Sequence, residues 1–183
     1  MRQAGGVVDA GRVVVRRATR DDERDLLGLA ASFATSFEVD PMMFTQQLLA
    51  MLSDSSSALV VATIETEVIG YAAASMHSTL YANGPVAWIE ELMVTETCRR
   101  AGIGRLLVAA VEDWVRSRGG VMIALATRRA ATFWSSVGFE ESASYFRRFT
   151  TDRGSELVPH RPRMPERRTP PPSPHPPRTR TRP

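Results

Sequence analysis

The chain has 183 residues and a formal net charge of +3, and ten of its 12 prolines lie in residues 151–183, which leaves about 150 residues for a single hydrophobic core. The sequence has no run of 18 apolar residues and no secretory signal, and its single cysteine, Cys98, excludes an intramolecular disulfide, so we expect a cytoplasmic protein without a membrane span. The sequence pI is basic, but residues 151–183 hold eight of the arginines and only three acids, so residues 1–150 carry a charge of −2, which argues against specific nucleic-acid binding.

The proline distribution also sets the expected domain organisation. We expect residues 1–11 to be a flexible N-terminus, residues 12–150 to form one domain, and residues 151–183 to be a disordered tail rich in proline and arginine. The domain opens with a β-branched run at 12–18 that predicts a strand. Thr19 is a suitable N-cap for a helix to about residue 37, because three acids follow it in the first turn.

The rest of the domain alternates between apolar strand-like runs and amphipathic runs, separated by turn residues. Pro41 suits the first position of the second helix, and Gly119-Gly120 suits the end of the third. The predicted elements are a helix at 41–52, strands at 58–64, 67–76 and 87–94, a helix at 104–118, a strand at 121–126, a helix at 129–137 and a strand at 143–149. This order predicts an α/β fold with a mixed sheet.

The most informative segment is the glycine turn between the strand at 87–94 and the helix at 104–118. It has the pattern Arg-x-x-Gly-x-Gly, with Arg99, Gly102 and Gly104 at the fixed positions. The first turn of a helix has unpaired N–H groups and a partial positive charge, so it favours a pyrophosphate. We expect Gly102 to let the backbone approach the phosphate oxygens, and Gly104 to relieve the tight entry into the helix.

A second motif follows about thirty residues later. It reads Ala-x-x-Phe-Trp-x-x-x-Gly-Phe, from Ala130 to Phe139. The two motifs, in this order after the strand Ile-Glu-Glu-Leu-x-Val, resemble the GNAT N-acetyltransferase superfamily over roughly residues 12–150. The resemblance implies a GNAT-like central mixed β-sheet flanked by helices, and acetyl-CoA as the co-substrate. A Rossmann site fits less well, because it needs Gly-x-Gly-x-x-Gly and position 107 is Leu.

The resemblance also implies which residues bind acetyl-CoA. The strand would hold the pantetheine arm through backbone hydrogen bonds and polarise the thioester carbonyl with a backbone N–H, a role that falls on Leu92, Met93 and Val94. The pyrophosphate would lie on the turn formed by Arg99, Arg100, Ala101, Gly102, Ile103 and Gly104.

Two acids, Glu90 and Glu91, are the candidate catalytic residues. An alkyl amine is mostly ammonium at pH 7, so a nearby carboxylate that accepts its proton would assist transfer of the acetyl group to a primary amine by direct attack. The family resemblance selects Glu90, four positions before Val94. Adjacent residues on a regular strand point to opposite faces, so at least one acid should face solvent, and two solvated surface acids remain the alternative interpretation.

A proton donor for the departing thiolate is harder to identify. Many members of the family have a tyrosine where this chain has Trp134, and an indole N–H does not act as an acid. Trp134 would steady the sulfur, pack on the pantetheine arm or belong to the core. Tyr81, Tyr145 or water would then supply the proton.

Cys98 and His77 suggest no chemistry of their own. We expect Cys98 to be inert, and His77 to lie on the rim of a substrate pocket or in solvent. With three histidines in the chain, two of them beyond residue 150, the sequence predicts no metal site. The acceptor stays open between a small molecule and a protein, and a homodimer is compatible with either. The alternative function is a non-catalytic acyl-CoA-binding regulatory module.

Overall fold

A five-stranded mixed sheet forms the centre of the protein in the computed structural model, which describes residues 12–34, 38–148 and 150. The strands lie in chain order, and β5 is parallel to β4 whereas all the other neighbours are antiparallel. They are β1 (Val13–Arg17), β2 (Ser57–Ile64), β3 (Glu67–His77), β4 (Val86–Val94) and β5 (Met122–Leu125). The predicted fold class is therefore confirmed.

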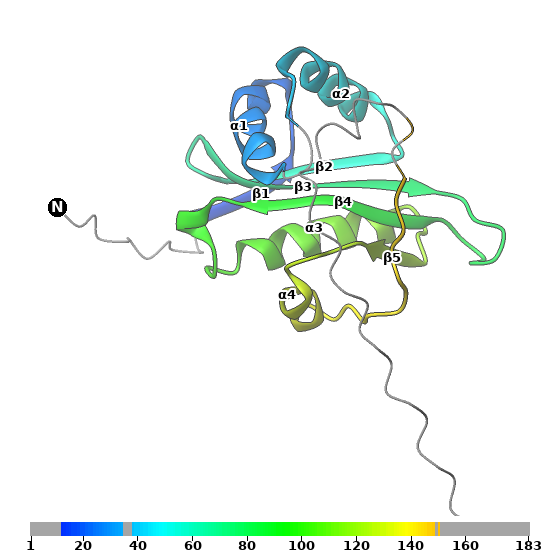
Figure 1. The fold of residues 1–183 in the computed structure, drawn as a ribbon. Coiled ribbons are helices and arrows are strands. Elements are labelled where there is room, and N and C mark those ends of the chain that lie inside the picture. The colour runs from blue at the N-terminus through cyan, green and yellow to red at the C-terminus, as the bar shows by residue number, and fades with distance from the viewer. Residues whose placement is uncertain (1–11, 35–37, 149, 151–183) are drawn as a thin grey trace, which may run out of the picture.

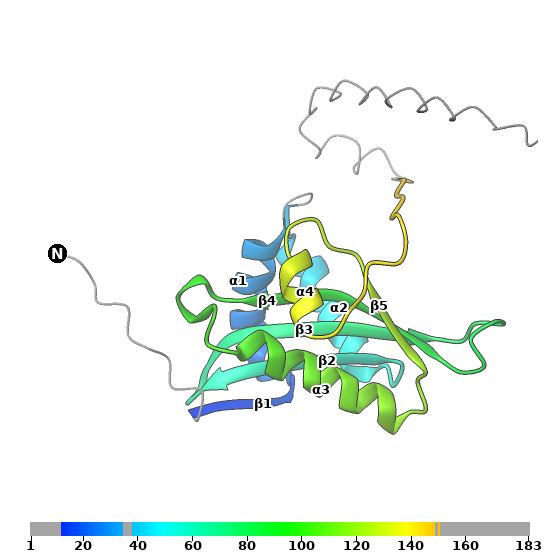
Figure 2. The ribbon, with the colours of Figure 1, turned by 90° about the horizontal axis from the view of Figure 1, so that it is seen from below.

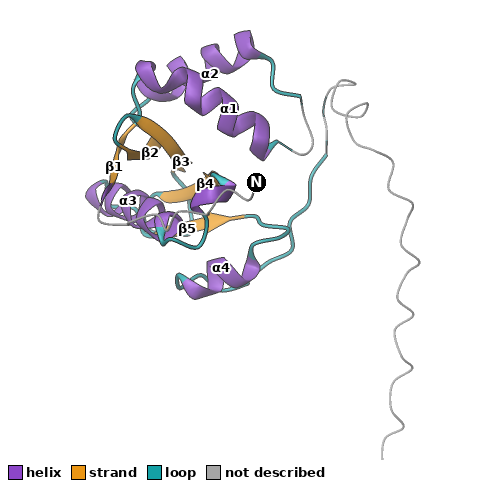
Figure 3. Cartoon of the chain, turned by 90° about the vertical axis from the view of Figure 1, so that its left-hand side faces the viewer, coloured by secondary structure: helices purple, strands orange, loops and turns teal. Residues whose placement is uncertain are grey.

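Helices cover both faces of this sheet. Figures 1 and 3 show α1 (Glu23–Phe33) and α2 (Pro41–Ser53) on one face, and α3 (Ile103–Ser117) and α4 (Ala131–Ser136) on the other. Figure 2 views the sheet from the α3 side, and α3 lies in front of the sheet along β2 and β3. We call the two sides the α1/α2 face and the α3/α4 face.

Each face has its own hydrophobic cluster, because side chains alternate along the strands. On β3, for example, Ala72 and Ala74 belong to the cluster beneath α3, whereas Tyr71 and Ala73 belong to the cluster beneath α1 and α2. The helices contribute the largest buried side chains, among them Leu26 of α1 and Leu107 of α3. The sheet therefore separates two cores.

Local capping fixes where the helices on the α1/α2 face begin. The carboxylate of Asp22 accepts the N–H of Thr19 at 2.8 Å in the short 3-10 helix η2 (Arg20–Asp22), which leads into α1. Asp40 accepts the N–H groups of Met42 and Met43 at 2.9 Å, and Pro41 occupies the first position of α2. The sequence predicted the start of α2 but not the cap at Asp40.

Two predicted elements differ from the structure. The first helix ends at Phe33 rather than at residue 37, because Ala34 is already extended. The strand predicted at 143–149 is absent over residues 143–148, while residue 149 lies outside the described part. Tyr145 and Phe146 favoured a strand by β propensity, but every residue from 140 to 148 is exposed, so no buried face stabilises one.

The terminal segments predicted at 1–11 and 151–183 lie wholly outside the described residues. Within residues 12–34, 38–148 and 150, no helix is both long enough and apolar enough to cross a membrane.

Candidate active site

β4 and β5 separate partway along β4. Their last paired residues are Ile89 and Leu125, and β4 continues to Val94 without a β5 partner. The backbone groups of residues 90–94 that face this side are therefore open to a ligand, except for the carbonyl oxygen of Val94, which accepts from Arg99. Leu92, Met93 and Val94, the predicted pantetheine-binding residues, all lie in this part of the strand, which pairs with β3 but has no β5 partner.

Glu90 lies in a β-bulge. Ala73 of β3 pairs with Glu91, and Ala74 pairs with Ile89, so Glu90 is an extra residue without a partner on β3. A bulge shifts the alternation of the side chains that follow it. As a result Ile89 and Leu92 both pack toward α3, although a regular strand would direct them to opposite faces.

The bulge places both acids on the α1/α2 face. Ser75 donates to Oε1 of Glu90 at 2.8 Å, and the hydroxyl of Tyr71 donates to Oε2 of Glu91 at 2.5 Å. Both donors lie on β3 and project from its α1/α2 face. The expectation that the two acids point to opposite faces is therefore wrong, because the extra residue removes the regular alternation between them.

Tyr71 of β3 anchors the Glu91 carboxylate through this hydrogen bond. It is only 3% exposed, and burial, followed by the Glu91 charge and hydrogen bond, raises the pKa of its hydroxyl. Tyr71 is therefore protonated throughout the working pH range and serves only as a donor to Glu91. No sequence pattern predicts this pair, because it depends on the register of β3 against β4.

The predicted phosphate cradle is an exposed turn between β4 and α3. After the 3-10 helix η3 (Glu96–Cys98), Arg100 has a φ of 66° and Gly102 a φ of 83°. Arg99 turns back and donates from Nε to the carbonyl oxygen of Val94 at 3.1 Å, which fixes the turn to the end of β4.

This turn meets the conditions for an anion. The N–H groups of Arg105 and Leu106 are the first to bond back, both to the carbonyl of Gly102, so those of Ile103 and Gly104 have no intrahelical acceptor. No atom lies within 4 Å of the position a Cβ would take on Gly102. The backbone is therefore accessible from outside, and the helix dipole points its positive end there.

Gly104 has a packing role that the sequence did not indicate. A Cβ there would lie 3.1 Å from the ring of Phe133, so the glycine allows α4 to pack against the start of α3. Ala101 is half-buried and packs on the same cluster, whereas Arg99 and Arg100 are exposed.

Trp134 is a core residue. It is 8% exposed and makes edge-to-face contacts with Phe133 and Phe139, at ring-centroid distances of 5.1 and 5.2 Å. Cys98 is also buried in the α3/α4 cluster, in agreement with an inert thiol. Of the residues considered as acids, Tyr81 is exposed on the β3–β4 connection, and Tyr145 packs against Trp88.

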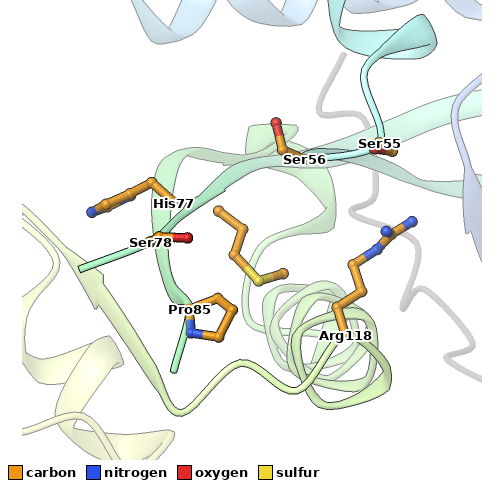
Figure 4. Close-up of a pocket in the computed structure, with 7 residues that line it drawn as sticks. Ser55, Ser56, His77, Ser78, Pro85 and Arg118 are labelled. Carbon is orange, nitrogen blue, oxygen red and sulfur yellow. The ribbon is translucent and has the colours of Figure 1, made fainter. Parts of the chain in front are cut away.

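His77 lies far from the glycine turn. It lines a shallow hollow of about 270 Å³ together with Arg118, and Figure 4 shows the two side chains on opposite sides of it. Arg118 follows the C-terminal end of α3, whereas the turn precedes its N-terminal end, about 22 Å away along 15 helical residues. Within the described residues no group of three or more His, Cys, Asp or Glu side chains could hold a metal.

Comparison with known proteins identifies this arrangement. The family model described as "Acetyltransferase (GNAT) family" matches residues 23–139, which is more than half of the chain. The chain belongs to the GNAT acetyltransferase family. No curated protein matched significantly.

Several solved structures have the same fold. A transcriptional regulator from Bacillus halodurans C-125 superposes with a TM-score of 0.68 at 22% identity, over 75% of this chain and 99% of that one. Glucosamine-6-phosphate N-acetyltransferase from Arabidopsis thaliana gives 0.68 at 16% identity, over 76% and 99%. The aminoglycoside N-acetyltransferase AAC(6')-Iy, in complex with CoA, gives 0.67 at 22% identity, over 76% and 95%.

Proposed function

We propose that this GNAT protein is an acetyl-CoA-dependent N-acetyltransferase that transfers an acetyl group to a primary amine by direct attack. One observation carries the proposal. The end of β4 has no β5 partner and leads through η3 into an open glycine turn, and the bulge of β4 presents two anchored carboxylates on the α1/α2 face. Acetyl-CoA and the amine that receives the acetyl group could therefore meet at β4.

The donor side fits acetyl-CoA. The free N–H groups at the start of α3 and the exposed guanidinium of Arg100 would bind the pyrophosphate. The open backbone of residues 92–94 would hold the pantetheine arm, and one of its N–H groups would donate to the thioester oxygen as negative charge develops there. Acetyl-CoA supplies the activated acetyl group when bound.

The acceptor side provides a base. Glu90 accepts a proton from the ammonium group, directly or through water, and the neutral amine nitrogen can then form the new bond to the carbonyl carbon as the carbon–sulfur bond breaks. Because Trp134 is packed between two phenylalanines, water or Tyr145 is the better candidate to protonate the departing thiolate. We also propose a cytoplasmic location, since the buried free thiol of Cys98 suits a reducing compartment.

Release of free CoA thiol tests this function. Acetyl-CoA would be incubated with the full chain and, in turn, sisomicin, glucosamine 6-phosphate and a peptide with a free N-terminus. We expect thiol release with at least one type of amine, and a product mass increased by one acetyl group. Tight acetyl-CoA binding without release for any amine would instead support the non-catalytic acyl-CoA-binding module.

A further inference from the structure

Trp88 lies on the α1/α2 face without belonging to its core. Its neighbours Ala87 and Ile89 are buried toward α3, so Trp88 projects to the opposite side, where it pairs in register with Ser75. It is half-buried and is not part of either hydrophobic cluster. The side chain therefore presents part of its aromatic surface next to Ser75, the residue that anchors Glu90.

A second aromatic ring stands beside it. The ring of Tyr145 lies 6.5 Å from that of Trp88, tilted by 33°, and Tyr145 is 63% exposed. Tyr145 comes from the segment after α4, which crosses from the α3/α4 face toward α2 (Figures 1 and 3). The two rings meet where the pairing of β4 with β5 ends, one residue beyond Trp88.

A carboxylate next to exposed aromatic faces is a combination that suits a particular kind of amine. The carboxylate neutralises an ammonium group, and an aromatic face attracts both the cation and the flat apolar body that carries it. A purely structural Trp88 would be expected inside one of the two clusters. The half-buried Trp88 and the exposed Tyr145 both lie outside the two clusters, so the packing of the core does not explain why these rings lie next to the serine that anchors Glu90.

We propose that Trp88 and Tyr145 form a wall of the acceptor site, and that the acceptor is a primary amine carried on a ring, which lies against Trp88 while its ammonium group reaches Glu90. This inference rests on the proposed function, because it names the kind of acceptor that the same site receives. It makes Trp88 and Tyr145 specificity-determining residues.

The test is a ratio of rates for two amines. Benzylamine carries its ammonium group on a methylene attached to an aromatic ring, and 2-methoxyethylamine carries an ammonium group on a chain without a ring. We expect the wild type to favour benzylamine in kcat/KM, and Trp88→Leu to lower the benzylamine preference by about two- to twelve-fold, following the range of aromatic pair energies. The attraction between an aromatic face and the ammonium group cancels in this ratio, because both amines carry that group. General damage to the fold would lower both rates together and leave the ratio unchanged.

Two further variants keep the test decisive. Tyr145→Ala should lower the same ratio without affecting folding, because the side chain is mostly exposed, whereas Phe146→Ala, its 89% exposed neighbour, should leave it unchanged. An unchanged ratio in both Trp88→Leu and Tyr145→Ala would overturn the proposal while the transferase function stood.

Failure of the proposed function would look different, with no thiol release from the wild type for any amine. In that case calorimetry of benzylamine binding to the CoA-bound protein tests the aromatic wall separately from the transferase function. Binding that Trp88→Leu weakens would support the wall, and absent or equal binding would overturn it.

Discussion

Glu90 and Glu91 face the same side of the sheet because β4 contains one residue more than β3 can pair. Each carboxylate has its own donor on β3, so neither is a freely rotating surface acid. Glu90 is the more exposed of the two and is held by a half-buried serine, which leaves its carboxylate accessible to a ligand. Glu91, held by a buried tyrosine, is better suited to a fixed charge.

Replacement of Glu90 tests its role as the base. Glu90→Gln keeps the size of the side chain and a hydrogen bond to Ser75, but it cannot accept a proton. We expect kcat near neutral pH to fall ten-fold or more, with the acetyl-CoA affinity nearly unchanged. Glu112→Gln, on the α3 helix, is the control for loss of one negative charge. Full activity of Glu90→Gln across the pH range would assign the base to Glu91 or to water.

Asp22 provides a pH-sensitive contact that does not involve the site. Both its oxygens accept from Arg16 at 2.7 Å, and these bonds, with that from Thr19, lower the pKa of the buried Asp22 carboxyl. In the folded protein Asp22 stays charged at pH values that would protonate it in the unfolded chain. Its contribution is therefore complete above about pH 4 and is lost as the pH falls further.

We expect Asp22→Asn to lower the free energy of unfolding at pH 7 by about 2 kcal/mol, a value reduced from that of fully buried pairs because Arg16 is 40% exposed. The loss should shrink toward pH 3. Urea unfolding at several pH values measures it, with the exposed neighbour Asp21→Asn as the control. A loss independent of pH would show that the ion pair is not the cause.

At the scale of elements, the sequence predicted the helices and strands that carry strong periodicity, and β2 to β4 lie within one or two residues of their predicted bounds. The bulge at Glu90 could not be predicted, because it exists only in the register between two strands. The absent strand at 143–148 shows the reverse case, in which local propensity favours an element that finds nothing to pack on.

The glycine turn can be tested by separating charge from shape at Gly102. Asp and Asn both tolerate its positive φ better than other side chains, and a Cβ there meets no protein atom within 4 Å. If a pyrophosphate binds at this turn, Gly102→Asp should weaken acetyl-CoA binding about ten-fold or more through charge repulsion, and Gly102→Asn much less. Calorimetry measures both affinities, and equal values for the Asp variant and the wild type would exclude the turn as the phosphate site.

Helix α1 contains a glycine that the fold does not require. A Cβ on Gly28 would meet nothing within 4 Å, and glycine inside a helix is less favourable than alanine. We expect Gly28→Ala to raise the free energy of unfolding by about 0.5–1 kcal/mol, measured as a higher urea midpoint. Gly70→Ala should have the opposite effect, because its Cβ would lie 2.7 Å from the carbonyl oxygen of Met93. A destabilised Gly28→Ala would show that the helix needs this glycine.

For the whole molecule, the uneven charge of the chain leads to a prediction about residues 151–183. They carry a net charge of +5, so truncation after Thr151 should abolish most binding to a heparin column at low salt. Acetyl-CoA binding and the melting temperature should change little, since the proline content disfavours a packed core. A full-length chain with the eight tail arginines changed to glutamine is the matched control. A fall of many degrees in the truncated protein would show that the segment packs on the domain.

The two separate cores have a consequence for how such a protein can diverge. The glycine turn is attached to the α3/α4 cluster through Ile103 and Cys98, whereas Tyr71 and Met93 on the other face belong to the cluster with α1 and α2. The sheet acts as a partition, so substitutions that accumulate under α1 and α2 could reshape what is recognised on that face while the opposite layer keeps its geometry. A lineage could in this way exchange one acceptor for another without having to rebuild its donor site.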